Sequence, residues 1–346
     1  MVMNMNPIAG ASAMNQVDGK DSLWAVYLEL GKIRLSALVV ITAIAGFLLA
    51  SRGSLDLWRL FWTAVGTGCA AVGANSFNQW REKMRDARME RTRGRPLPTG
   101  KISSRHAFFW SMAISSAGLL ILATQVNGLT ASLAAANIFI YVLIYTPMKV
   151  YSSLCTLVGA VCGAIPPMMG WTAATGQLDY GAWVLGATLF VWQIPHFLSL
   201  AWMYRRDYAR GGFRMLPVTD SKGQITCNVI LLYSLALLPL GLAYFLGGLT
   251  GLLFLTGSFL LGAVFFALSV QLFLERSERN ARRLFLASII YLPILLGLMV
   301  TDRSSASAPP LRLHALNSTL FEDETIDSMK ESAPIRIQTT KPWQGR

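Results

Sequence analysis

The chain has 346 residues, of which 53% are hydrophobic and only 14% charged, and its mean hydropathy is +0.46. This composition excludes an ordinary soluble domain and indicates a polytopic membrane protein. The formal net charge of +12 could suggest a nucleic-acid partner. None is predicted, because the basic residues gather in short connections between apolar segments.

Nine apolar segments are long enough to cross the hydrocarbon of a bilayer. In chain order they cover residues 36–51, 57–77, 107–125, 129–147, 154–174, 181–204, 226–246, 251–274 and 284–301. The first is the shortest, and the interfacial side chains Trp24 and Tyr27 before it predict that its helix extends towards the N-terminus. The sequence therefore predicts an all-α membrane protein with nine transmembrane helices.

The placement of Lys and Arg predicts which side of the membrane each connection faces. Nine lie in residues 78–106, five in 205–225 and four in 275–283, whereas the alternate short connections hold only Arg52 and Arg59. Because cytoplasmic or matrix loops carry the basic excess, we expect the N-terminus inside and the C-terminus outside.

The membrane domain is predicted to cover residues 24–301, between two extramembrane segments. Residues 1–23 have no continuous apolar run and are not rich in Arg, so this flexible extension carries neither a recognisable signal peptide nor a transit peptide. A bacterial plasma membrane is therefore favoured over a mitochondrial inner membrane. Residues 302–346 lose the apolar periodicity and mix Ser and Pro with acidic residues, which predicts a disordered tail.

Asn78, Glu82 and Asp86 recur at steps of four after the second apolar segment. At about 100° per residue, each step of four drifts only about 40°, so the three side chains share one helix face over about 12 Å. Three hard oxygen ligands in a row suit Mg²⁺. The spacing predicts a metal site where this helix leaves the membrane.

An arginine-rich loop follows, and Pro96 and Pro98 are expected to end the helix and fix the loop. Guanidinium groups offer planar forks for phosphate oxygens that a metal leaves uncovered, so the pattern predicts a metal-diphosphate site. The alternative is a solvated helix face that anchors the chain to anionic lipid. That alternative explains neither Asn78 nor the one-face spacing of the carboxylates. The arginines are Arg88, Arg91, Arg93 and Arg95.

A second connection on the same side repeats this pattern of carboxylate, arginines and a Leu-Pro stop. It contains Asp207 among several arginines and ends at Pro217. Two such loops suggest an internally duplicated bundle whose halves face a central cavity. Lys149, at the end of the fourth apolar segment, adds a cation on the same side, or alternatively only marks the membrane interface.

Gln193 and His196 lie inside the sixth apolar segment, where apolar residues would avoid the free-energy cost of burying polar groups. Polar residues at such depth are functional candidates by default. The alternative is a histidine that bonds to a backbone carbonyl freed at Pro195. His106 and His314 are expected to be ordinary surface residues.

At these residues the chain resembles the UbiA-type intramembrane prenyltransferases and, within them, the heme O synthases. The resemblance covers roughly residues 25–300. The superfamily motif N-x-x-x-D-x-x-x-D is matched by Asn78, Glu82 and Asp86. Further similar runs are Met-Glu-Arg-Thr-Arg-Gly-Arg-Pro-Leu-Pro (89–98), Tyr-Thr-Pro-Met-Lys (145–149), Gly-Ala-Ile-Pro-Pro-Met-Met-Gly (163–170), Gln-Ile-Pro-His (193–196), Asp-Tyr (207–208) and Met-Leu-Pro (215–217).

The resemblance implies nine transmembrane helices around a central cavity and transfer of a farnesyl group from farnesyl diphosphate to a vinyl group of heme b. It also implies roles for individual residues. Mg²⁺ would be held on the diphosphate by Asn78, Glu82 and Asp86, with Asp207 as a further acidic ligand. Arg91, Arg95 and Lys149 would bind the diphosphate, and Gln193 and His196 would face the porphyrin. Heme A synthase or oxidase assembly factors would be downstream partners.

Two positions depart from the family pattern. Glu82 replaces the commoner aspartate. Met203 stands where the wider superfamily often has a carboxylate, four residues before Asp207, so the binding of a second metal ion stays an open question. Alternatives are a prenyltransferase of the same fold that acts on a quinone precursor or chlorophyllide, and a transporter of an anionic lipid or metabolite. A transporter has little use for carboxylates beside arginines unless a cation bridges them.

Overall fold

The computed structural model describes residues 22–303, and its named elements are all helices. The predicted extension and tail lie almost entirely outside this range. The elements are α1 (Leu23–Leu30), α2 (Ile33–Ala50), α3 (Leu57–Asp86), α4 (Ser104–Gln125), α5 (Gly128–Phe139), η1 (Ile140–Tyr145), α6 (Thr146–Tyr151), α7 (Cys155–Thr175), α8 (Tyr180–Met203), α9 (Arg205–Arg210), α10 (Leu216–Thr219), α11 (Gln224–Ala236), α12 (Leu240–Leu246), α13 (Leu252–Leu274) and α14 (Glu278–Thr301).

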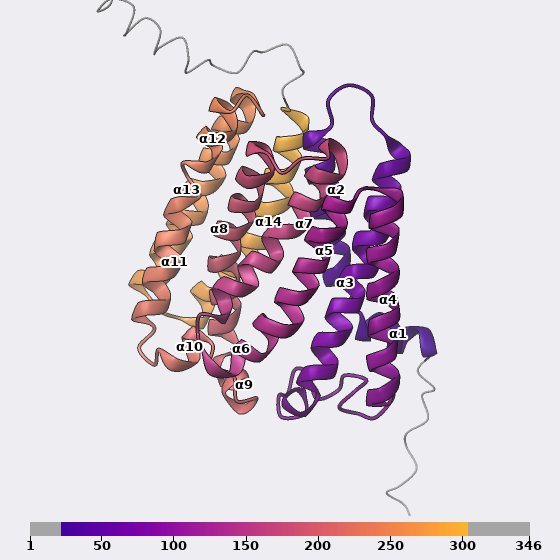
Figure 1. Ribbon diagram of the computed structural model, residues 1–346. Coiled ribbons are helices and arrows are strands. Elements are labelled where there is room, and N and C mark those ends of the chain that lie inside the picture. The colour runs from indigo at the N-terminus through magenta and orange to yellow at the C-terminus, as the bar shows by residue number, and fades with distance from the viewer. Residues whose placement is uncertain (1–21, 304–346) are drawn as a thin grey trace, which may run out of the picture.

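The long helices stand side by side as a single bundle, which confirms the predicted all-α fold (Figure 1). The short helices α6, α9 and α10 lie together at one end of the bundle, as does the loop after α3. The described chain enters near this end through α1 and leaves at the opposite end through α14. Its first and last described residues therefore lie at opposite ends, as the predicted topology requires.

Eight helical stretches of the described chain are long and apolar enough to cross a membrane, so the protein is an integral membrane protein. The predicted count of nine apolar spans is one too high. The exception is α3, whose apolar run is interrupted by Gly, Thr, Ser and Asn residues. At 1.5 Å per residue its 30 residues still extend about 45 Å, and it packs against α2 and α4 within the bundle.

The chain does not continue helically from Trp24 and Tyr27 into α2, so that prediction is wrong. It breaks at Gly31 and Lys32, and Lys32 is left-handed with φ 48°, the one non-glycine residue with positive φ in the described chain. A Cβ at Gly31 would lie 2.8 Å from Cγ1 of Val72 on α3. Close approach to α3 therefore requires glycine here and turns α1 away from the axis of α2.

The fourth long helix widens in its middle, where η1 is a π-helical segment between α5 and α6. Pro147 has no amide hydrogen and its ring disfavours an ordinary turn before it. The amide of Thr146 instead donates to the carbonyl of Tyr141, five residues earlier, and the Thr146 hydroxyl donates to the same oxygen at 2.7 Å. Such widened turns often occur at functional sites, and this one directs Thr146 towards α3.

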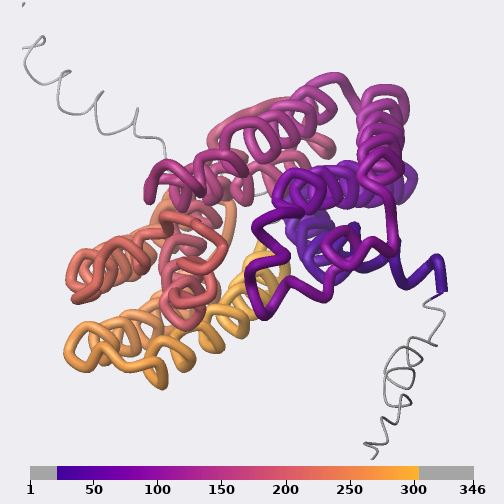
Figure 2. The backbone as a smooth tube through the Cα atoms, turned by 90° about the horizontal axis from the view of Figure 1, so that it is seen from below, coloured from indigo at the N-terminus to yellow at the C-terminus, as the bar shows by residue number. Residues whose placement is uncertain are grey.

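Helix α3 ends at Asp86, well before Pro96 and Pro98, so the prediction that these prolines end it is wrong. The chain turns back immediately, because Thr92 donates from its hydroxyl to the Asp86 carbonyl at 3.0 Å. Leu97 is fully buried in the returning loop. The loop therefore folds over the end of α3, near the middle of this face of the bundle (Figure 2).

Helices α2 and α7 approach so closely that glycine is required where they touch. A Cβ at Gly170 would lie 1.8 Å from the carbonyl oxygen of Ala43, and one at Gly46 would lie 2.1 Å from that of Pro167. Backbone atoms cannot move aside as a flexible side chain can. The contact keeps α2 against the helix that lines the cavities described below.

We expect Gly170→Ala to destabilise the folded protein by about 2 kcal/mol, because overpacking a tight contact costs about 1–3 kcal/mol. The measurement is thermal unfolding in detergent. Gly297→Ala on α14 is the matched control, since a Cβ there meets no atom within 4 Å. An unfolding temperature equally unaffected by both changes would contradict the close approach of α2 and α7.

Candidate active site

The predicted oxygen ligands do share one face at the end of α3, and all three are buried. Asn78 is 0%, Glu82 6% and Asp86 1% exposed. Buried carboxylates without partners are strongly unfavourable, so the residues that surround them must supply positive charge or donors.

Each of the three side chains contacts a cation from a different part of the chain. The Lys32 ammonium donates to Asn78 Oδ1 at 2.7 Å. Lys149 Nζ lies 2.8 Å from Glu82 Oε1, and Arg95 Nη1 lies 2.8 Å from Asp86 Oδ2. The structure therefore brings Arg95 and Lys149, two of the residues expected to bind the diphosphate, next to the carboxylates.

Lys149 is positioned by aromatic rings as well as by Glu82. Its ammonium lies 4.5 Å from the centroid of the Tyr145 ring and 5.9 Å from that of Phe213. One helical position before Pro147, Thr146 accepts a hydrogen bond from Asn78 Nδ2 at 3.1 Å. Helix α6, which follows the π segment, thus carries both Lys149 and Thr146 to the polar face of α3.

Lys32 lies at the break between α1 and α2 and was not predicted as a site residue. Burial lowers its pKa to about 7, and the nearby Arg95 guanidinium adds to the decrease. In the sequence it stands just before the first apolar segment, near the end of the chain expected on the inner side. A lysine directly before an apolar span is a common interface residue, so no local signal distinguishes it.

Asp207 lies at the same end of the bundle but has other partners. Its carboxylate accepts from the backbone amides of Glu90 at 2.9 Å and Arg91 at 3.4 Å, and it lies 3.1 Å from Arg210 Nη2. Arg85 Nη1 also donates to the Gly211 carbonyl at 3.1 Å. The two similar loops therefore contact one another, and Asp207 holds the loop that follows α3.

Arg91 is exposed, and its side chain contacts tyrosines rather than the three buried pairs. Its guanidinium carbon lies 5.1 Å from the Tyr204 ring centroid and 5.6 Å from that of Tyr208, and its Nη2 donates to the Tyr208 hydroxyl at 3.4 Å. Arg91 and Asp207 line an open cavity of about 400 Å³ between the two loops.

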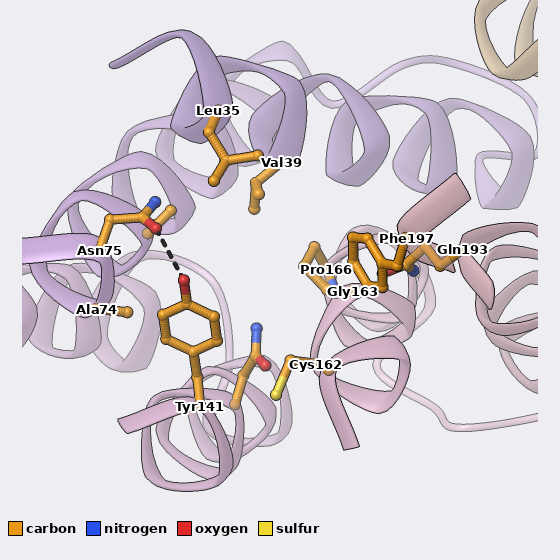
Figure 3. A pocket seen from close by; sticks show the side chains of 13 residues that line it. Leu35, Val39, Ala74, Asn75, Tyr141, Cys162, Gly163, Pro166, Gln193 and Phe197 are labelled. Atoms are coloured by element: carbon orange, nitrogen blue, oxygen red, sulfur yellow. Dashed lines mark hydrogen bonds between the residues drawn. The ribbon is translucent and has the colours of Figure 1, made fainter. Parts of the chain in front are cut away.

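A cavity of about 120 Å³ lies inward of the polar face, between α2, α3, the π segment, α7 and α8 (Figure 3). Tyr141 donates to Asn75 Oδ1 across it at 3.2 Å, and Asn75 Nδ2 donates to Ser36 Oγ at 3.0 Å. Val39, Pro166 and Phe197 supply apolar lining. We call this space the central cavity.

A second cavity of about 220 Å³ adjoins it between α2, α7, α8 and α14, and we call it the lateral cavity. The two cavities share the residues Val39, Gly163, Pro166, Gln193 and Phe197. A Cβ at Gly163 would lie 2.0 Å from Gln193 Oε1, so the glycine makes room for the amide in the shared wall. His196 lines only the lateral cavity.

His196 does not bond to a carbonyl freed at Pro195, so the alternative proposed for it is wrong. Its Nδ1 lies 2.7 Å from Ser288 Oγ on α14. Gln193 Nε2 donates to the Leu189 carbonyl at 3.1 Å. Both predicted side chains therefore line the cavities, at a greater depth than the charged pairs.

Comparison with known proteins identifies the architecture. A family model described as the UbiA prenyltransferase family matches residues 39–292. The chain is 42% identical over 286 residues to the protoheme IX farnesyltransferase of Solibacter usitatus (strain Ellin6076), which covers 80% of this chain and 98% of that one.

The chain belongs to the UbiA prenyltransferase family.

The same family contains longer relatives. The chain is 44% identical over 290 residues to the mitochondrial protoheme IX farnesyltransferase of Homo sapiens, which covers 82% of this chain and 65% of that protein. The predicted resemblance is thereby confirmed, and the chain is a prenyltransferase rather than a transporter.

Solved UbiA structures confirm the fold. A digeranylgeranylglyceryl phosphate synthase matches with a TM-score of 0.69 at 17% identity, over 81% of this chain and 98% of that one. A UbiA homolog from Archaeoglobus fulgidus bound to GPP and Mg²⁺ matches with a TM-score of 0.57 at 13% identity, over 79% and 99%. The family thus includes a member with a bound metal and prenyl diphosphate.

The residues on α3 fit a divalent metal. Asp86 Oδ1 is buried and has no hydrogen-bond partner in the described chain, so it is a carboxylate oxygen without a donor. Asn78 and Glu82 add further hard oxygens on the same face. No three His, Cys, Asp or Glu side chains of residues 22–303 converge closely enough to hold a metal alone. Mg²⁺ does not need three such side chains from the protein, since it usually keeps substrate phosphates and waters as further ligands.

We expect Asp86→Asn to weaken Mg²⁺ binding at least about tenfold, because it removes one unit of ligand charge while keeping an acceptor for Arg95. Calorimetric titration of Mg²⁺ in the presence of inorganic diphosphate measures the affinity. Glu90→Gln is the matched control, because its carboxylate is exposed and pairs with Arg210 at 3.2 Å. Unchanged affinity in Asp86→Asn would exclude this carboxylate as a ligand.

Proposed function

We propose that the protein transfers the farnesyl group of farnesyl diphosphate to a vinyl group of heme b, giving heme O and diphosphate. Relatives that carry the name protoheme IX farnesyltransferase are 40–44% identical over at least 80% of the chain. The single observation that carries the mechanism is the position of an apolar cavity directly inward of a buried cluster of oxygen ligands and cations.

The charged cluster would act on the leaving group. When the allylic carbon–oxygen bond breaks, negative charge gathers on the diphosphate, and fixed positive charge lowers the energy of that transition state. A bound Mg²⁺, held by Asn78, Glu82 and Asp86, supplies part of this charge. Arg95 and Lys149 supply the remainder, since both already lie within 2.8 Å of the carboxylates that would hold the metal.

Lys32 joins this group in our proposal. Its ammonium contacts Asn78, the first of the three ligands, and so lies within the cluster. Arg91 and Asp207 have separate roles: Asp207 positions the loop that carries Arg95, and Arg91 meets the diphosphate at the cytoplasmic rim, where it lines the open cavity. Asp207 would become a metal ligand only if this loop shifted, because its carboxylate accepts from two backbone amides and pairs with Arg210.

The central cavity would hold the prenyl chain next to the reacting carbon. Water must be kept from an allylic cation until the new bond has formed, and apolar lining does this. The stacked rings of Tyr141 and Tyr145, with centroids 5.4 Å apart, offer negative faces that stabilise a cation. These aromatic groups lie between the cluster at Lys149 and the cavity at Asn75.

The lateral cavity would hold the porphyrin. It shares a wall with the central cavity, so a vinyl group at that wall can reach the allylic carbon. The terminal vinyl carbon forms the new bond as diphosphate leaves, and water then adds to the carbon next to the ring and releases a proton. Gln193 lies in the shared wall and can donate to or accept from this water.

The basic loops favour an active site on the cytoplasmic side of a bacterial plasma membrane, or on the matrix side in a mitochondrial setting. Residues 24–301 would form the whole catalytic domain, between the extension and the tail. Product release into the bilayer would supply heme A synthase or an oxidase assembly factor. Both substrates are lipophilic with anionic ends, which suits a membrane cavity below a basic rim.

Purified protein in detergent with Mg²⁺, farnesyl diphosphate and heme b is expected to yield a more hydrophobic heme, detected by mass spectrometry together with released diphosphate. Asp86→Asn or a chelator should reduce turnover at least about 100-fold, because transition-state charge stabilisation is lost. Full turnover in either condition would overturn the assignment. Prenylation of a quinone precursor or chlorophyllide in place of heme would support the alternative acceptors.

Lys32→Ala is expected to raise KM for farnesyl diphosphate about tenfold or more, because hydrogen bonds to charged groups contribute about 1.5–3 kcal/mol. Steady-state kinetics at saturating heme b would measure it. Lys83→Ala is the control: it removes the same charge next to Glu82, but its ammonium contacts Ser104 Oγ at 3.2 Å. Equal effects of the two changes would show a general charge effect rather than contact with the diphosphate.

A further inference from the structure

The ring of His196 stacks against two aromatic rings. Its centroid lies 4.9 Å from that of Trp192 with planes 20° apart, and 5.0 Å from that of Phe285 with planes 28° apart. Trp192 is itself fixed, because its Nε1 donates to the Ser288 carbonyl at 3.1 Å. The imidazole therefore stacks on one ring from α8 and on one from α14, and it cannot rotate without losing these contacts.

The hydrogen bonds at Ser288 determine which ring nitrogen carries the proton. A serine hydroxyl has one hydrogen, and Ser288 donates it to the carbonyl of Phe285 at 2.5 Å. Its oxygen must then accept at the 2.7 Å contact with His196, so the proton is on Nδ1. The neutral ring is left with a lone pair on Nε2, which makes no hydrogen bond in the described part of the chain.

The surroundings of this lone pair are apolar. The lateral cavity is lined mainly by Leu, Ile, Val, Pro and aromatic residues, and its polar lining is limited to Thr42, Gln193 and His196. An unpaired polar atom in such a place is unfavourable unless a ligand bonds to it. Because Nδ1 is engaged by Ser288 and the ring is stacked on Trp192 and Phe285, Nε2 is the ring nitrogen left to meet a ligand in the lateral cavity.

We propose that Nε2 of His196 is an axial ligand of the iron of the porphyrin acceptor, and that Ser288 positions the ring for this bond. The proposal rests on the proposed function, which supplies the iron porphyrin. Neutral imidazole is a common axial ligand of heme iron. Histidines that bind metals nearly always donate their other N–H to an oxygen atom, as His196 does to Ser288.

Such a bond would solve a positioning problem in this cavity. The cavity is open on one side, where Leu38 is 56%, Ile41 53% and Ile289 45% exposed, so its walls alone cannot fix a flat macrocycle. One iron–nitrogen bond fixes the centre of the macrocycle on α8. The ring edge then reaches the wall at Gln193 and Phe197, beyond which the prenyl chain lies.

The test is the absorption and electron paramagnetic resonance spectrum of heme b bound to the full-length protein in detergent. We expect His196→Ala to lose the signature of a nitrogen ligand and to bind heme at least about tenfold more weakly. Added imidazole should restore the wild-type spectrum, because it can occupy the space left by the side chain. His106→Ala is the control, since that ring is exposed and bonds to the Tyr27 hydroxyl at 2.7 Å.

Ser288 is tested separately, because His196→Ala could perturb the fold. Ser288→Ala leaves the imidazole in place and is expected to weaken heme binding and shift the spectrum, whereas Ser288→Thr should retain both. A wild-type spectrum in His196→Ala would overturn the proposal. If that variant kept the spectrum but lost turnover, the ring would act on the reacting water and not on the iron. Heme O formation, measured on the same samples, reports independently on the proposed function.

Discussion

The structure at the functional end of the bundle depends on charge pairing around one face of α3. Glu82 and Asp86 are almost completely buried, and a buried carboxylate left alone costs several kcal/mol. Their partners come from α6 and from the loop after α3, while Asn78 is met by Lys32 from the α1–α2 break. Three separate segments are thus drawn to one helix face, and this end closes by electrostatics as much as by apolar packing.

The same pairing limits how ligands can enter. A metal that bound alone to the carboxylates would leave the cations without an anionic partner. A diphosphate that bound alone to the cations would leave the carboxylates buried without one. If both arrived together, Glu82 and Asp86 would bind the metal and the cations would bind phosphate oxygens, so that no charge would be left buried without a partner. In the proposed reaction the site would therefore favour the metal-diphosphate complex over either component.

Helical periodicity explains why the core of the site could be predicted from sequence. Steps of four residues place Asn78, Glu82 and Asp86 on one face whatever the rest of the fold does. Lys32 could not be found in this way, because its contact with Asn78 spans 46 positions and depends on a left-handed residue at a helix break. Arg91 was grouped with Arg95 by closeness in sequence, but the turn between them sends their side chains to different partners.

The fold could be predicted as a helical membrane bundle, whereas its local irregularities could not. Counting apolar runs in the sequence treated α3 as a span like the others, although its polar residues separate it from the eight most apolar helical stretches of the described chain. The π segment before Pro147 changes which side chains face α3, and no simple periodicity shows such a change of register.

The cavities show how the apolar half of the site complements the charged half. Two lipophilic reactants must meet at one point, yet each needs its own space, and here the division between the spaces is a wall of few side chains. Gly163 leaves room in that wall for the Gln193 amide, which a Cβ at this position would displace. Gln193 holds its place through the Leu189 carbonyl, one turn earlier on the helix that also carries His196. A single helix, α8, therefore contributes both the polar group at the boundary and the nitrogen that faces the lateral cavity, so a shift of α8 would move both together.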